Sequence, residues 1–194
     1  MHGLVNRSVQ SFLRDTYGAG LWSVIARDLG MGADGFEAMM RYDDALTDAL
    51  LAAAARRLDR PRETILEDIG TYLVSHPNHE RLRRLLRFGG VGFIDFLHSL
   101  DELPDRGRLA VPDLDLPALE LMDAAPGQFR LVCREGFPGI GHLIVGVLRA
   151  MADDYGALVL LDHAEDGPGQ EVVTIHLLDT RFAAGRRFDL AGGA

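Results

Sequence analysis

The spacing of apolar residues changes at Pro104, and this change constrains the fold more than any other feature of the chain. Before Pro104, apolar residues recur at intervals of three and four, which is the period of amphipathic helices. After it, short runs typical of strands surround one further helical segment. With 194 residues and 47% apolar content, the chain is long enough for one buried core. The pattern predicts a single α+β domain over residues 1–190, with a helical part at about 1–103 and a mixed sheet and helix part at about 104–190.

Each predicted element has its own apolar stripe, and glycine or proline lies near many of the boundaries between elements. Pro104 lacks a backbone donor and clashes with a preceding helical turn, so it is predicted to stop the last helix of the first part. In the second part, Gly156 suits a helix cap, and Val173, Ile175 and Leu177 mark the buried face of a strand. The predicted helical segments are 4–17, 22–29, 45–58, 65–73, 80–87, 93–103 and 143–155, and the predicted strands are 116–122, 128–133, 157–162 and 172–178.

Charge and apolar run lengths exclude several classes of partner and site. A formal net charge of −9 repels phosphate backbones, and no long basic stripe overrides it, so we expect no nucleic acid partner. The longest apolar runs, at 49–55 and 157–161, are far shorter than the roughly 20 residues that cross a bilayer. Without an apolar leader and cleavage site, a cytoplasmic location away from membranes is expected. Cys133 is the single cysteine, which excludes an internal disulfide and multi-cysteine metal sites.

Three stretches that together cover most of the chain carry family-like motifs. They are MHGLVN at 1–6 with YG at 17–18 and WSVI at 22–25; YDD at 42–44 with LLAAA at 50–54 and ILEDIG at 65–70; and FLHSLDEL at 96–103. These stretches resemble the heme-nitric oxide/oxygen-binding (H-NOX) family. The resemblance implies a sensor domain with a helical part packed on an antiparallel sheet and a heme pocket between them. It also implies signalling by a shift between the two parts, passed to a histidine kinase, a diguanylate cyclase or a guanylate cyclase.

The third stretch leads to the position that binds heme iron in the family. The resemblance implies a histidine there, followed by twelve residues, a proline that touches the heme, and a strand with a Tyr-x-Ser-x-Arg signature. Counting back from Pro117 across residues 105–116 places Pro104 at the ligand position, and a proline ring has no lone pair for iron. Arg134 matches the arginine of the signature, while Arg130 and Val132 replace its tyrosine and serine. We therefore expect conventional histidine-ligated heme binding to be lost.

Arg134 has two open roles. Its guanidinium could hold a carboxylate or phosphate of a pocket ligand through paired hydrogen bonds, or it could form a surface ion pair near Glu135. If a ligand is bound, the resemblance implies a mostly apolar cavity between the helical part and the sheet. The other residues that it places near such a cavity are Leu4, Leu73, Leu97, Leu100, Pro104, Pro117 and His142.

Two histidines and the cysteine are alternative iron ligands. His142 follows a loop at 136–141 and begins a segment resembling the helix that reaches the distal side in the family, although capping that helix is its plainer role. His98 lies six residues before Pro104 and so points away from the ligand direction. Cys133 is either a thiolate ligand or a small core residue. The remaining histidines are expected in loops or exposed strand positions: His76, His79, His163 and His176. Of these, His76 and His79 could form at most a weak metal pair.

Nothing in the sequence predicts catalysis. The adjacent acids at 43–44, 101–102 and 153–154 are typical of solvated helix ends, and the sequence contains no P-loop, ordered catalytic triad or dinucleotide-binding motif. The leading hypothesis is a noncatalytic sensory or regulatory domain whose pocket binds something other than histidine-ligated heme, or nothing. One alternative is a heme gas sensor with an unconventional ligand, His142 or less readily His98 or Cys133. The other is a structural adaptor whose pocket is filled by side chains.

Overall fold

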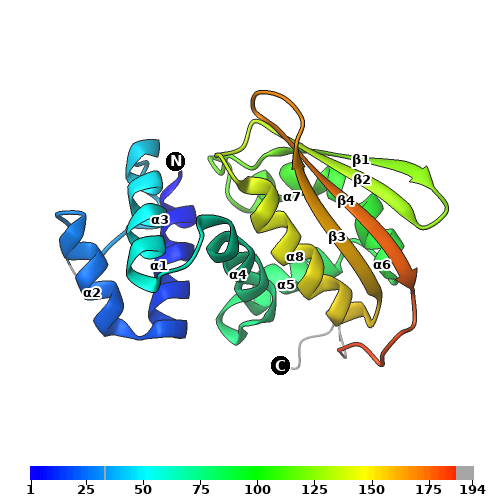
Figure 1. The fold of residues 1–194 in the computed structure, drawn as a ribbon, viewed down its shortest axis with the longest axis horizontal. Coiled ribbons are helices and arrows are strands. Elements are labelled where there is room, and N and C mark those ends of the chain that lie inside the picture. The colour runs from blue at the N-terminus through cyan, green and yellow to red at the C-terminus, as the bar shows by residue number, and fades with distance from the viewer. Residues whose placement is uncertain (33, 187–194) are drawn as a thin grey trace.

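The computed structural model describes residues 1–32 and 34–186 and has the α+β architecture that the sequence predicts. Figure 1 shows helices α1–α3 at one end, the sheet at the other, and α4 and α8 between them. Within the described part, no helix is long and apolar enough to cross a membrane. The elements are α1 Gly3–Tyr17, α2 Ala19–Asp28, α3 Asp44–Leu58, α4 Arg62–Ser75, η1 Pro77–His79, α5 Glu80–Arg87, α6 Phe93–His98, η2 Leu100–Glu102, α7 Leu103–Ala110, β1 Ala118–Ala125, β2 Gln128–Arg134, α8 Ile140–Tyr155, β3 Leu158–Glu165 and β4 Gln170–Asp179.

The helical part is built around its own apolar core. The side chain of His2 accepts a hydrogen bond from the Leu4 backbone N–H at the start of α1, and Asp43 caps α3 in the same way through Ala45. Between α1 and α2 the chain turns at Gly18, whose φ of 90° favours glycine. The core residues of this part that are almost inaccessible to solvent include Leu13, Trp22, Ile25, Leu50, Leu51, Ile65 and Ile69.

The second part is a four-stranded antiparallel sheet in the order β1-β2-β4-β3. Its inner face packs against α8 and α6, and Leu131, Val173 and Ile175 on that face are fully buried. Leu177, predicted for the same face, is half-buried and packs on this core. Because side chains alternate along a strand, the outer face carries Arg130, Val132 and Arg134 of β2.

Pro104 does not stop the preceding helix, and this part of the prediction was wrong. The helix α6 ends at His98, a 3-10 turn follows at Leu100–Glu102, and Pro104 then lies in the first turn of α7. Proline is tolerated at that position because the first N–H groups of a helix have no partner within it. The predicted helix at 93–103 is therefore divided into α6, η2 and the first residue of α7.

The helices α4 and α8 approach each other so closely that two glycines are required. A Cβ atom on Gly70 would lie 2.1 Å from the carbonyl oxygen of Leu143, and one on Gly146 would lie 2.0 Å from that of Glu67. The hydroxyl of Thr71 also donates to the carbonyl of Gly146 across this contact, at 3.3 Å. Backbone therefore packs on backbone, and this contact joins the helical part to the helix that covers the sheet (Figure 1).

Candidate functional site

The four leucines proposed for a pocket lie in different parts of the structure. Leu97 and Leu100 are at most 2% exposed and pack in the core beneath the sheet. Leu73 is half-buried against the core of the helical part, and Leu4 is half-buried on α1. The structure therefore does not gather these four residues in one cluster.

Phe137 and Leu143 occupy the junction between the two cores, which the sequence did not indicate. Both side chains are half-buried, and each packs against the core of the helical part and the core beneath the sheet. Phe137 belongs to the loop before α8, and Leu143 lies in the first turns of that helix. The only signal in the sequence was a large aromatic residue in a Gly/Pro-rich loop next to a predicted helix.

Pro104 and Pro117 are both buried and lie at the two ends of one connection. α7 begins with Pro104 in its first turn, and β1 begins directly after Pro117. Between them, Leu116 packs so closely on Gly107 of α7 that a Cβ atom there would lie 2.5 Å from its Cδ1 atom. The position that the resemblance assigns to an iron ligand is thus a buried ring without a donor atom.

Arg134 lies on the outer face of the sheet, away from Leu97 and Leu100. Its guanidinium forms an ion pair with Glu120 of β1, and its Nε donates to the side chain of Gln170 at 2.9 Å. Its neighbour Cys133 points to the inner face instead and is buried in the core with both leucines. Arg134 therefore makes the kind of surface ion pair that the sequence allowed, although its partner is Glu120 and not Glu135.

The structure places Cys133 and His98 in different environments. Burial, with a smaller contribution from Glu171, raises the pKa of Cys133 to about 12, so this thiol is protonated at neutral pH. His98 is half exposed, with its Nε2 atom 3.7 Å from Oδ1 of Asp123 and its ring edge-on to Phe129. Cys133 thus lies in the apolar core, and His98 lies at a solvated edge.

His142 belongs to a polar cluster that connects α4, α8, β3 and β4. Its ring stacks on that of His163, with centroids 3.9 Å apart, and its Nδ1 atom lies 3.4 Å from Oε1 of Glu67. Nε2 of His163 lies 2.7 Å from Glu171, whose carboxylate also accepts the N–H groups of Gly139 and Gly141. The expected exposed position of His163 was wrong, because its side chain points inward toward α8 and is only 14% exposed. His142 stacks and pairs here and does not cap α8, whose first N–H groups are bound by Glu171 instead.

His76 and His79 both contact the ring of Tyr72 at the end of α4. Their ring centroids lie 4.7 and 4.9 Å from that of Tyr72, and Nδ1 of His76 is 3.9 Å from Oδ2 of Asp15. The Nε2 atom of His79 is buried without a hydrogen-bond partner among the described residues. Across residues 1–32 and 34–186, no group of three or more His, Cys, Asp or Glu side chains is arranged to hold a metal ion.

His79 should make the protein less stable in mild acid. Burial, reinforced by nearby His76 and opposed by Asp15, lowers the pKa of His79 below its ordinary value. The unfolded chain then binds this proton at a higher pH than the folded chain, so the free energy of unfolding falls as the pH drops through about 6.5. We expect the free energy of unfolding of His79→Leu to change less with pH than that of the native chain when urea unfolding is measured between roughly pH 7.5 and pH 5. The half-exposed His98→Leu serves as a control, and an unchanged slope in His79→Leu would refute this assignment.

The arrangement of helices and sheet defines the class of protein. It is similar to a point mutant of the T. Tengcongensis H-NOX, with a TM-score of 0.77 and 15% identity over 93% of this chain and 99% of that one. It is also similar to an S. oneidensis H-NOX protein in the Fe(II)NO ligation state, with a TM-score of 0.76 and 14% identity over 92% and 100% of the chains. The chain therefore has the H-NOX fold.

The family follows from the sequence itself. Residues 2–163 match the family model described as Haem-NO-binding. This match covers most of the chain, so the protein belongs to the haem-NO-binding family, as the motifs of the sequence predicted.

The curated relatives are much longer proteins. Soluble guanylate cyclase 89Db of Drosophila melanogaster is 22% identical over 158 residues, which are 81% of this chain and 24% of that protein. Soluble guanylate cyclase gcy-31 of Caenorhabditis elegans is 23% identical over 154 residues, which are 79% and 22% of the respective chains. The chain thus spans about a quarter of the length of these relatives.

Proposed function

We propose that this chain is a noncatalytic sensory or regulatory domain that has lost conventional histidine-ligated heme binding and responds to another ligand or to a protein partner. The observation that carries this proposal is Pro104, which stands thirteen residues before Pro117 where the family resemblance requires a histidine. A proline ring cannot form the axial bond to iron.

The surroundings of Pro104 support the same proposal. Leu97 and Leu100, expected near a pocket, are fully packed into the core beneath the sheet. Arg134 is on the opposite face of the sheet, where its Nε donates to Gln170 and its Nη1 to Glu120. The residues present therefore do not fit heme in the manner that the family resemblance implies.

The contact between α4 and α8 supports a signalling role. A domain of this family is expected to signal by a shift between its helical part and its sheet part, and here Gly70 and Gly146 join those parts backbone to backbone. We propose that a ligand or partner changes this contact and that a signalling protein in the cytoplasm, such as a histidine kinase or a cyclase, detects the change. The soluble guanylate cyclases among its relatives support a cyclase as one such partner.

A structural adaptor with a filled pocket is a second candidate, favoured by the burial of Leu97 and Leu100. A heme sensor ligated by His142 has less support. Its ring would have to leave the stack on His163 and the contact with Glu67 to reach iron.

Titration of hemin into purified protein separates these candidates. We expect no stoichiometric Soret band for the native chain and a band for Pro104→His, because that substitution restores a nitrogen donor at the ligand position. Pro112→His, at an exposed proline of the same connection, is the matched control and should gain no band. If Pro104→His folds but also stays colourless, the filled pocket of the adaptor is favoured. A native band that disappears in His142→Ala would instead establish the unconventional sensor.

A further inference from the structure

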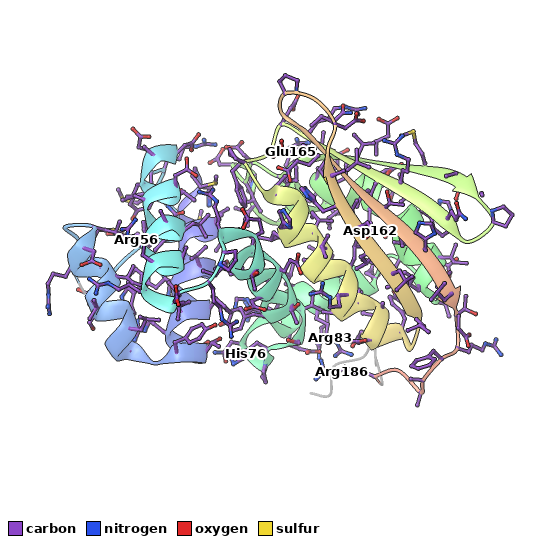
Figure 2. All side chains as sticks on the ribbon, viewed as in Figure 1. Arg56, His76, Arg83, Asp162, Glu165 and Arg186 are labelled. Carbon is purple, nitrogen blue, oxygen red and sulfur yellow. The ribbon has the colours of Figure 1, made fainter. Side chains whose placement is uncertain are left out.

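A polar cavity of about 260 Å³ lies in the helical part, apart from the residues discussed above for heme. One side is formed by α1, and the others by the segment at 34–36 and by Asn78 of η1. Figure 2 labels His76 at the end of α4 that faces α1, directly before the turn that supplies Asn78. The cavity thus lies where α1 meets the connection between α4 and α5.

The floor of this cavity is held in a fixed shape by Gln10. Its side chain is 5% exposed, donates to the carbonyl of Asp34 at 3.1 Å, and accepts the N–H of Phe36 at 2.9 Å. Between these contacts, Gly35 has a φ of 76° and approaches Gln10 so closely that a Cβ atom would lie 2.3 Å from Oε1. The segment at 34–36 is therefore locked onto α1.

The opposite wall is also built from paired groups. Oδ2 of Asp15 accepts hydrogen bonds from the Tyr72 hydroxyl at 2.6 Å and from the Asn78 side chain at 2.9 Å. The bond from Tyr72 holds the pKa of Asp15 below its ordinary value, so this carboxylate is charged at neutral pH. Asp15 is thus hydrogen-bonded within the protein and positions Asn78 at the cavity.

Three donors on α1 face the cavity without an acceptor. Arg7, Ser11 and Arg14 are spaced four and three residues apart, which places them on one face of the helix. In the part of the chain that the structure describes, neither arginine has an ion pair or hydrogen bond, and neither does the Ser11 hydroxyl.

Arg27 on α2 and Arg56 on α3 also have no ion pair or hydrogen bond from their side chains among the described residues, so the shared cavity, and not the lack of partners, sets this triad apart. Ser8 and Ser23 each donate to the carbonyl four residues earlier, both at 2.9 Å, as helix serines commonly do. Arg57 and Arg62, on neighbouring helices, pair with Asp28 and Asp48. The donors of the triad are thus available to a ligand in a cavity whose walls are fixed.

We propose that this cavity binds a small molecule with an oxyanion at one end and a hydrogen-bond donor at the other. The guanidinium groups of Arg7 and Arg14, with the Ser11 hydroxyl, suit a carboxylate or phosphate. Asp34 lines the same cavity, and its carboxylate has no partner among the described residues, so it suits an ammonium or hydroxyl group of the ligand. Because the cavity holds two arginines and two aspartates, a ligand with both kinds of group balances its charge better than a simple anion.

Calorimetric titration of the full chain at constant ionic strength tests this site. The probes are phosphoethanolamine, β-alanine and inorganic phosphate; the first two carry an ammonium group and differ in the oxyanion. We expect saturable binding of phosphoethanolamine, β-alanine or both. The probe that binds more tightly identifies the oxyanion as a phosphate or a carboxylate. Inorganic phosphate should bind more weakly. Arg14→Gln and Arg7→Gln should each lower the affinity about tenfold or more, because each removes a charge-assisted hydrogen bond.

Two further variants make the outcome decisive. Arg56→Gln removes the same charge from an exposed position on α3 outside the cavity (Figure 2) and should leave binding unchanged. Asp34→Asn should weaken phosphoethanolamine more than inorganic phosphate, because only the former has an ammonium group. Failure of both ammonium-bearing probes to saturate, or equal losses in Arg14→Gln and Arg56→Gln, would overturn the site. If Asp34→Asn weakens the binding of phosphoethanolamine and of inorganic phosphate equally, the proposed contact between Asp34 and the ammonium group is wrong.

Discussion

Gly146→Ala should lower the free energy of unfolding by about 3 kcal/mol or more, as in severe overpacking of a core. The added methyl group would lie 2.0 Å from the carbonyl oxygen of Glu67 and 2.9 Å from the backbone nitrogen of Thr71. Neither is a flexible side chain that can rotate away, so α4 and α8 would have to separate. Urea unfolding followed by circular dichroism measures the loss.

Gly20→Ala is the matched control for this prediction. Gly20 is also a helix glycine, but a Cβ atom there meets nothing within 4 Å. Alanine favours the helix by up to about 1 kcal/mol over glycine, so this variant should be as stable as the native chain or more so. If both variants behave alike, the close contact between α4 and α8 does not hold the two parts together.

Asp154→Ala should also destabilise the protein strongly, by about 3–5 kcal/mol. Asp154 is 1% exposed at the end of α8, and its Oδ1 atom accepts from Nε of Arg83 on α5 at 2.9 Å. Figure 2 shows Arg83 at this end of α8, close to Arg186, whose backbone N–H donates to the carbonyl of Asp154. Removing the carboxylate leaves the charge of Arg83, 10% exposed, without its buried counterion.

The adjacent Asp153→Ala provides the comparison for this ion pair. Asp153 is exposed in the last turn of α8, where a negative charge opposes the helix dipole. Its removal should change the free energy of unfolding by less than about 0.5 kcal/mol, as is usual at the surface. Thermal and urea unfolding of both variants check the difference, and similar losses at 153 and 154 would contradict the buried pair.

Local sequence signals predicted most elements of this fold. The helix at Glu80–Arg87 has the predicted bounds, and the glycines at 89–90 follow its end. The division near Pro104 was harder to predict, since proline both ends helices and begins them. The structure shows that Pro104 lies in the first turn of α7, which begins at Leu103 after α6 has ended at His98.

The candidate sites depend on contacts that a single sequence does not reveal. The predicted strand ended at residue 162, before His163, whereas β3 continues to Glu165 and its pairing with β4 turns the ring of His163 toward His142. The polar cavity depends on Gln10 contacting residues 24 and 26 positions away. The motif spacing, in contrast, predicted the family without any tertiary information, and the same spacing led to the proposal for Pro104.

The most direct test of the proposed loss of heme is the visible absorption spectrum of the native protein, expressed with ample heme precursor and recorded with and without nitric oxide. We expect a flat spectrum in the Soret region in both conditions, because Pro104 offers iron no axial bond. A stoichiometric Soret band that shifts with nitric oxide would contradict the proposal and show that another residue of this chain binds heme iron.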